Sequence, residues 1–212
     1  MTRSFPTKIY HFTRVEHLPT ILTAGLLSDS KAQAAGLMQI EIGQQSIKAR
    51  RAETPVRASS GGVVADYAPF YYAPRSPMMH NIHKGKVPSY QEGCDRLIYL
   101  ATHTQVLVEA GHTWVATDRN AVLSHAEFSD SDDRLTEMVD WDVMELESCF
   151  PVPEHPDRVE RRMAEFLVRG QVPFTDFMAI GVKTPMLKTE VDKMLSAHGS
   201  SLQAIVRPAW YF

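Results

Sequence analysis

Polar and apolar positions first alternate over 8–13, where β-branched and aromatic residues predict a β-strand. Leucine and isoleucine then recur at helical spacing over 15–27, which predicts a helix. Its start is expected close to residues 16–17, because Pro19 is tolerated only in the first turn, and Gly25 is a natural end. A strand that runs through a short loop into a helix often presents a ligand, so the exit of this strand is a candidate site.

The rest of the chain alternates between short predicted strands and helices, and Asp118 can cap one of these helices. No internal repeat is present, and the pattern predicts one α+β domain over 1–212. The predicted strands are 96–102, 113–117, 177–183 and 204–212, and the predicted helices are 104–109, 118–128 and 187–198, with a further amphipathic element around Trp141, Met144 and Leu146.

The stretch 161–172, RRMAEFLVRGQV, places one carboxylate, Glu165, among apolar residues. Periodicity does not decide whether 165–168 is a strand or the end of a helix that starts near His155. Glu165 is either a surface residue paired with Arg161 or Arg169, or a carboxylate held in a site.

The segment 28–55 is rich in Ala, Gln, Ser and Gly, and a short helix is predicted at 44–51. Such a segment contributes little to a core, so it is either a lid over a ligand or a solvated excursion. Arg50 and Arg51 end the predicted helix, where cations interact favourably with the helix dipole.

Aromatic residues gather in 63–82, where Pro74 and Pro77 argue against a regular central strand or helix interior. This segment is either a rigid stacking platform or a satellite core. Arg75 with the neighbouring Met78 and Met79 adds a cation and apolar surface, which are suitable materials for contact with nucleic-acid bases.

Composition narrows the class of protein. The 212 residues carry a net charge of −3, which does not indicate a nucleic-acid binder overall. Cys94 and Cys149 are far apart and show no metal or disulfide spacing, and we read the acidic run 129–133 as solvated, so no metal is expected and activity should persist in chelator. No membrane span or leader pattern is present, and we expect a cytoplasmic monomer.

Several stretches taken together resemble the DarT family, the toxins of DarT–DarG systems, which use NAD to ADP-ribosylate DNA bases. The resemblance covers essentially the whole chain, and the order of the stretches makes it specific. They are YHFTRVEHLPTILTAGLL, ARRA, GGVVADYAPFYYAPRSPM, TDRNAVLSHAEF, VDWDV, RRMAEFLV and RPAWYF.

The resemblance implies an ADP-ribosyltransferase fold, with two small antiparallel sheets around an NAD cleft and peripheral helices. It implies that 33–53 is the NAD-binding element and that 117–165 is a loop that presents substrate. It also implies catalytic roles for Arg51 and Glu165. The implied NAD contacts are His11, Phe12, Thr13, Thr20, Ser28 and Arg51, to which we add Tyr71.

The implied chemistry is transfer of ADP-ribose to a thymine in single-stranded DNA, countered by a DarG-type macrodomain antitoxin. Glu165 would stabilise an oxocarbenium-like ribose. Arginine is a poor base, so we expect Arg51 to bind the NAD diphosphate or to polarise the base, with Glu165 as the candidate proton acceptor. We expect DNA to cross a face bearing Arg75, Met78, Met79, Asn120 and Arg158.

Three alternatives stay open at this point. The first is the same chemistry on guanine in DNA. The second is an inactive module that binds NAD or nucleic acid. The third is an ADP-ribosyltransferase that modifies RNA or protein.

Overall fold

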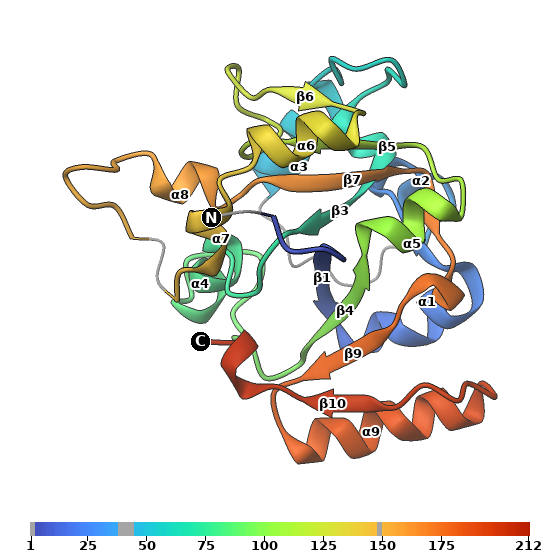
Figure 1. Cartoon of the computed structure of the whole chain (residues 1–212). Helices are drawn as coiled ribbons and strands as arrows, with labels where there is room; N and C mark the ends of the chain where they lie inside the picture. The colour runs from blue at the N-terminus through green and yellow to red at the C-terminus, as the bar shows by residue number, and fades with distance from the viewer. Residues whose placement is uncertain (1–2, 38–44, 148–149) are drawn as a thin grey trace.

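A computed structural model describes residues 3–37, 45–147 and 150–212 (Figure 1). The strands are β1 (Lys8–Arg14), β2 (Leu26–Leu27), β3 (Tyr67–Tyr71), β4 (Leu97–His103), β5 (Trp114–Thr117), β6 (Phe128–Ser129), β7 (Glu165–Arg169), β8 (Gln171–Val172), β9 (Ala179–Val182) and β10 (Ala204–Val206). The helices are α1 (Leu18–Ala24), α2 (Asp29–Ala34), α3 (Gln45–Glu53), α4 (Pro77–His83), α5 (Thr104–Glu109), α6 (Asp132–Met138), α7 (Trp141–Glu145), α8 (Arg158–Arg161) and α9 (Pro185–Ala197).

Within the described residues, eight strands form one sheet in the order β10-β9-β4-β1-β3-β7-β5-β6, and β2 pairs with β8. Neighbouring strands are antiparallel except β9 and β10. The prediction of two small antiparallel sheets is therefore wrong in this detail. The large sheet nevertheless narrows at its centre, because β1 and β3 are in register only at Tyr10 and Tyr71.

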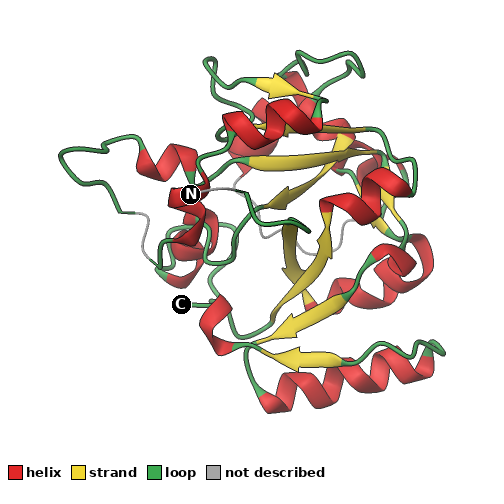
Figure 2. Cartoon of the chain, in the orientation of Figure 1, coloured by secondary structure: helices red, strands yellow, loops and turns green. Residues whose placement is uncertain are grey.

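The two halves of the sheet meet at this narrow junction. Figure 1 shows β5 and β7 on one side of β1 and β3, and β4, β9 and β10 on the other. The helices lie around the sheet, and α9 runs beside β10 (Figure 2). Because β1 and β3 separate beyond their one paired position, a ligand can lie between them while β1 stays paired with β4 and β3 with β7.

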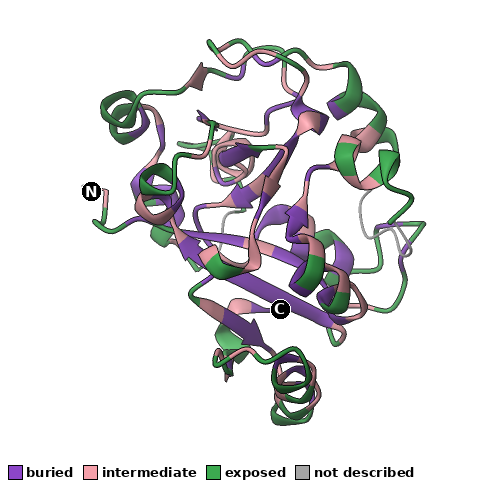
Figure 3. Cartoon of the chain, turned by 90° about the vertical axis from the view of Figure 1, so that its right-hand side faces the viewer, coloured by how far each residue is buried: buried purple, intermediate pink, exposed green. Residues whose placement is uncertain are grey.

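The core is built from the strand interiors. Burial is densest along the central strands (Figure 3), and six of the seven residues of β4 are buried. β7 is buried from Glu165 to Val168. This pattern answers the open question about 165–168: the segment is a strand, and only the short helix α8 precedes it.

Three predictions about local structure are wrong. Pro74 and Pro77 were expected to exclude a regular central strand from 63–82, yet the central strand β3 lies in this segment and contains Pro69. Pro77 begins α4, where a missing N–H costs no helical bond, so it does not interrupt a helix interior. Residues 118–127 form turns and not a helix, because the Asp118 carboxylate accepts the Glu127 N–H (2.8 Å) and closes a loop. The last strand stops at Val206, before a proline.

Most other elements are confirmed to within a few residues. The first strand, the helix that ends at Gly25 and the helix at 104–109 lie where the pattern predicted them. The helix predicted at 44–51 is α3, and the amphipathic element at 141–146 is α7. Cys149 lies outside the described residues.

Candidate active site

A buried ion pair joins α3 to β7. Arg51 Nη1 donates to Glu165 Oε1 at 2.8 Å, and the two residues are only 8% and 2% exposed. The convergence expected of these two residues is confirmed, and the reading of Glu165 as a surface residue paired with Arg161 or Arg169 is wrong. Burial alone would lower the pKa of Arg51, but the charge and hydrogen bond of Glu165 outweigh burial and raise it.

The Glu165 carboxylate is also fixed by the loop after β5. Its Oε2 accepts the Ala121 N–H at 3.0 Å, while the Glu165 N–H donates to the Thr117 hydroxyl at 3.1 Å. The Tyr72 hydroxyl donates to the Glu165 carbonyl at 3.3 Å. Each carboxylate oxygen thus makes one protein hydrogen bond and keeps further lone pairs for a ligand.

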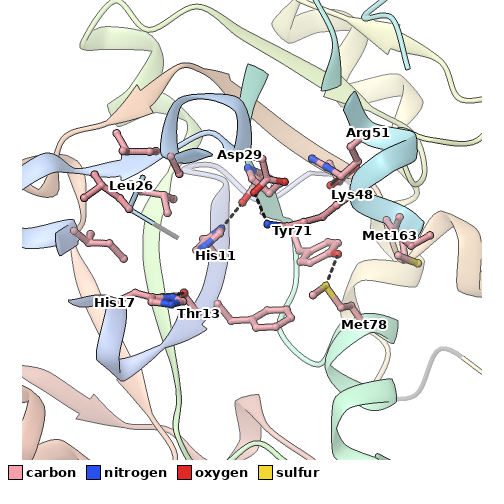
Figure 4. A pocket seen from close by; sticks show the side chains of 18 of the residues that line it. His11, Thr13, His17, Leu26, Asp29, Lys48, Arg51, Tyr71, Met78 and Met163 are labelled. Atoms are coloured by element: carbon pink, nitrogen blue, oxygen red, sulfur yellow. Dashed lines mark hydrogen bonds and ion pairs between the residues drawn. The ribbon is translucent and has the colours of Figure 1, made fainter. Parts of the chain in front are cut away.

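A cavity of about 440 Å³ opens beside this pair (Figure 4). Elements spread over residues 11–165 contribute its walls: β1, α1, β2, α2, α3, β3, α4, the loop after β5 and the start of β7. Nine of the predicted site residues line it. They are His11, Phe12, Thr13, Thr20, Arg51, Tyr71, Met78, Asn120 and Glu165.

His11 is held in one tautomer at the junction between β1 and β3. Its Nδ1 lies 2.8 Å from the Pro69 carbonyl oxygen, and because a carbonyl only accepts, Nδ1 carries the proton. Burial lowers the pKa of His11 to about 4, against the opposing effect of this hydrogen bond. The ring is therefore neutral near pH 7, and Nε2 is an acceptor.

The described parts of the segment 33–53 form one side of the cavity. Lys48 Nζ lies 3.2 Å from the Asp29 carboxylate, and Arg51 is one turn further along α3 (Figure 4). Arg51 Nη2 is buried and has no hydrogen-bond partner among the described residues. The prediction of an NAD-binding element at 33–53 also covers 38–44, which lie outside the described residues.

Tyr71 forms part of the opposite wall. Its ring stacks on Phe12 with centroids 6.3 Å apart, and its hydroxyl lies 3.9 Å from Met78 Sδ. Burial, and then the negative charge of Glu165, raise the pKa of Tyr71, so it remains a neutral hydrogen-bond donor.

Four predicted residues do not line the cavity. Ser28 is buried and caps α2 by accepting the Lys31 N–H. Met79 is fully buried against Tyr99, which is a correction, because a side chain in the core has no surface to offer DNA. Arg75 packs over Phe212, and Arg158 begins α8.

Several lining residues were missed, including His17, Asp29, Lys48, Asn81 and Met163. A signal existed for two of them. Lys48 lies three positions before Arg51 and so shares its helix face. His17 lies just beyond the strand exit that the sequence marked as a candidate site, and it is hydrogen bonded to Thr13 at 2.8 Å.

Within the described ranges, no group of three or more His, Cys, Asp or Glu side chains could hold a metal ion. No helix in the described part of the chain is long and apolar enough to cross a membrane.

Comparison with known proteins finds similar sequences and structures. A family model described as "ssDNA thymidine ADP-ribosyltransferase, DarT" matches residues 10–212. The DNA ADP-ribosyl transferase of Thermus sp. (strain 2.9) is 34% identical over 217 residues and covers 100% of both chains. That of Mycobacterium tuberculosis (strain ATCC 25618 / H37Rv) is 32% identical, covering 96% of this chain and 88% of its own.

Solved structures agree with the sequence comparison. Thermus sp. 2.9 DarT in complex with ADP-ribosylated ssDNA superposes with a TM-score of 0.92 at 33% identity, over 100% of this chain and 99% of that chain. The same protein in complex with NAD+ gives a TM-score of 0.88 at 32% identity, over 100% of both chains.

The fold and the cavity beside a buried Arg–Glu pair define an NAD-dependent ADP-ribosyltransferase. Within that class, the chain belongs to the DarT family of ssDNA thymidine ADP-ribosyltransferases. It is an enzyme that uses NAD as substrate to ADP-ribosylate DNA. The expected fold and activity are confirmed, and thymine is favoured over guanine by the family description.

Proposed function

We propose that the cavity beside Arg51 and Glu165 binds NAD, and that these two residues act on it during ADP-ribosyl transfer to thymine in single-stranded DNA. The observation that carries this proposal is the 2.8 Å contact between residues 114 positions apart in sequence, at the wall of a cavity of about 440 Å³. A volume of this size lies within the range of small-molecule sites.

The proposed NAD contacts follow from the chemistry of the walls. His11 Nε2 is an acceptor for a ribose hydroxyl or for the nicotinamide amide, and Thr13 and Thr20 supply hydroxyl groups. Lys48 and Arg51 place positive charge where a diphosphate would lie, and Arg51 Nη2 has no hydrogen-bond partner in the described part of the chain. Ser28 positions α2 and so shapes this side of the site without lining it.

In the proposed reaction, the glycosidic bond of NAD breaks and its electron pair leaves with nicotinamide. The developing positive charge on the ribose faces the Glu165 carboxylate, which is preorganised by Arg51 and by the Ala121 N–H. A thymine ring nitrogen then forms the new bond to the ribose carbon and gives up its proton.

The proton acceptor is better assigned to Glu165 than to Arg51. The raised pKa of Arg51 keeps its guanidinium charged, so it has no lone pair to offer. Glu165 keeps free lone pairs beyond its two hydrogen bonds and lies on the cavity wall. Arg51 then orients the carboxylate and contacts NAD.

Single-stranded DNA is proposed to approach over Met78 and Asn120, which reach the cavity, with Arg75 and Arg158 outside it. The target base must leave its stack to reach the ribose, which single-stranded DNA allows at low cost.

The biological role proposed is that of a toxin that blocks DNA replication in the cytoplasm and is countered by a DarG-type antitoxin. Thermosipho africanus DarTG in complex with ADP-ribose shares the fold, with a TM-score of 0.78 at 18% identity over 97% of this chain and 51% of that chain. We propose that the present chain is a single catalytic domain and acts as a monomer.

The proposal is tested by incubating the protein with labelled NAD and a panel of single-stranded DNA, RNA and protein, followed by mass mapping of the modified base. Transfer to thymine in DNA is expected. Glu165→Gln should reduce transfer by about 10²-fold or more, because one preorganised electrostatic group is worth that much in comparable sites. Circular dichroism and NAD binding check that this variant folds. Wild-type-like transfer by a folded Glu165→Gln would overturn the catalytic assignment.

A further inference from the structure

The Glu165 carboxylate is held at two points, one on each oxygen. Arg51 contacts Oε1 through a single nitrogen, Nη1, at 2.8 Å, and its Nη2 has no hydrogen-bond partner within the described residues. This contact is therefore not the two-bond fork that fixes the plane of a carboxylate. The second point is the Ala121 N–H, which donates to Oε2 at 3.0 Å. The loop that carries Ala121 thus decides how Glu165 faces the cavity.

Thr117 ties the start of this loop to the backbone of Glu165. The pairing of β5 with β7 is in register as far as Ala116 and Phe166. At the next position the Glu165 N–H donates to the Thr117 hydroxyl at 3.1 Å, and that hydroxyl donates to the Arg119 carbonyl at 2.6 Å. A single, fully buried hydroxyl therefore joins the strand that carries the carboxylate to the turn that leaves β5.

The turn that follows directs the Ala121 N–H toward Glu165. Asn120 shapes the turn, because its side-chain oxygen accepts the Val122 N–H at 3.2 Å. The Asn120 carbonyl accepts the Leu123 N–H at 3.0 Å. Ala121 is fully buried, so its N–H cannot move away from the carboxylate without disturbing the packing around it.

Arg50 holds the far side of the same turn. It precedes Arg51 on α3, and its Nη2 donates to the Val122 carbonyl at 3.0 Å. Two neighbouring arginines of α3 therefore act on the two oxygens of Glu165 by different routes. Arg51 contacts Oε1 directly, whereas Arg50 fixes the loop whose N–H reaches Oε2.

We propose that Thr117 and Arg50 are positioning residues for Glu165. By holding the loop 117–122 they place the Ala121 N–H, and this donor keeps the carboxylate in the orientation that faces the developing charge on the ribose. Neither Thr117 nor Arg50 lines the cavity, so neither contacts NAD there. The inference rests on the proposed catalytic role of Glu165, and it predicts an effect on the chemical step and not on substrate affinity.

A purely structural role would give a different result. A buried hydroxyl that only satisfies backbone groups contributes to stability, and its loss lowers the unfolding midpoint. A hydroxyl that places a reacting group also acts on the transition state, where a displacement of about 1 Å can cost 10²-fold in rate. Measuring kcat, both KM values and the unfolding midpoint in the same variants separates the two roles.

The central variant is Thr117→Val, which keeps the shape of the side chain and removes its hydroxyl. Transfer of ADP-ribose from NAD to a single-stranded oligonucleotide with one thymine is measured at steady state. We expect kcat to fall by roughly 10- to 100-fold, while KM for NAD and KM for the oligonucleotide change by less than about 2-fold. Thr117→Ser retains a hydroxyl and should keep most of kcat.

Thr102→Val is the matched control. Thr102 on β4 is also buried, and its hydroxyl donates to the Asp176 carbonyl at the same distance of 2.6 Å. This variant removes an equivalent hydrogen bond away from Glu165, so it should lower the unfolding midpoint and leave kcat unchanged. Equal losses of kcat in Thr102→Val and Thr117→Val would overturn the proposal, and so would an unchanged kcat in a folded Thr117→Val.

A double variant tests whether Thr117 acts through Glu165. In a protein that already carries Glu165→Gln, Thr117→Val should cost little further, because the charge that it positions is gone. Fully additive losses would mean that the two residues act independently, and the positioning role would be lost. A protein with Glu165→Gln alone that is as active as the wild type would instead refute the proposed function of the cavity.

Arg50→Met removes the second hold on the loop. Arg50 is exposed, so this change disturbs no core packing, and it decides the question if Thr117→Val is unstable. We expect kcat to fall by about 5-fold, as for loss of one hydrogen bond, with both KM values kept. A change confined to KM for the oligonucleotide would make Arg50 a DNA contact and would overturn its positioning role.

Discussion

Arg51 and Glu165 neutralise each other in a place where either alone would be costly. Both side chains are less than a tenth exposed, and a buried charge without a partner is strongly destabilising. Among the residues that the structure describes, Arg51 Nη2 has no partner, so part of the pair's hydrogen-bonding capacity is left for a ligand. A site that keeps an unsatisfied buried donor gives up some stability in exchange for binding.

His11 gives the cavity a pH dependence. Its pKa of about 4 in the folded protein lies below the ordinary value of 6.5, so between these values the unfolded chain binds the extra proton. The contribution of His11 to the free energy of unfolding should be constant above pH 6.5 and should fall as the pH drops toward 4. The slope is at most about 1.4 kcal/mol per pH unit.

This prediction is checked by urea unfolding at several pH values across that window, for the wild type and for His11→Gln. Glutamine can still donate to the Pro69 carbonyl but does not titrate. The variant should lose the His11 part of the slope. An unchanged slope in His11→Gln would contradict the assignment.

At this scale the residues alone singled out Glu165 by its apolar neighbours, but only the family resemblance assigned catalytic roles to Glu165 and Arg51. From residues alone, Glu165 had equally good partners in Arg161 and Arg169, which are near in sequence. The real partner lies on α3, which packs against the short 3-10 helix Val64–Asp66 before β3, and β3 pairs with β7. Local spacing carries no information about a contact between distant elements.

Among the elements, the mispredicted ones share a cause. Pro74 and Pro77 were expected to exclude a central strand from 63–82, yet β3 lies in this segment and even contains Pro69, opposite Leu167. The structure tolerates it because β1 and β3 barely pair there, and the His11 side chain supplies the donor to the Pro69 carbonyl instead. Propensity rules assume a regular ladder, and the exceptions lie where the ladder opens to form the cavity.

Asp118 shows the same effect. An aspartate before an apolar run normally predicts a helix start. Here its carboxylate closes a loop with the Glu127 N–H, and the Ala121 N–H, freed from any helix, donates to Glu165. By contrast, elements away from the cavity, such as β4 and α5, were predicted well because only local packing shapes them.

Arg162 ties together the elements that surround the proposed DNA path. It is 4% exposed, and its Nη1 donates to the carbonyls of Val143, Met144 and Leu146 at the end of α7. Its Nη2 donates to the Pro74 carbonyl beside Arg75, which has φ of 56°. Arg162→Lys keeps the charge but cannot span these acceptors, since one ammonium replaces a fork of donors.

We expect Arg162→Lys to reduce the free energy of unfolding by about 2 kcal/mol, because buried carbonyls lose their donors. KM for the oligonucleotide should rise more than KM for NAD, since the turn before α4 loses a support. Arg134→Lys, at an exposed arginine on α6, is the control and should change neither constant. An equal rise in both KM values would mean that Arg162 is merely structural.

For the whole molecule, the net charge and the local charge of 75–86 make opposite predictions about DNA binding. A net charge of −3 should repel DNA weakly, whereas the stretch 75–86 contains basic side chains and no acidic one. If DNA contacts that stretch, counterions are released on binding, and log(kcat/KM) for the oligonucleotide should fall linearly with log of the salt concentration. The binding of NAD, which contacts few phosphates, should change much less.

The slope can be assigned to residues. Each phosphate contact to a single strand contributes about −0.7 to the slope, so Lys84→Gln with Lys86→Gln should make it shallower by roughly 1.4. The matched pair Lys188→Gln with Lys193→Gln on α9 changes net charge equally and should leave the slope as in the wild type. If both pairs shift the slope alike, the enzyme senses only its total charge, and DNA does not follow α4. If only Lys84→Gln with Lys86→Gln makes the slope shallower, this acidic protein binds DNA through one strip of its surface, and that strip begins at the cavity wall.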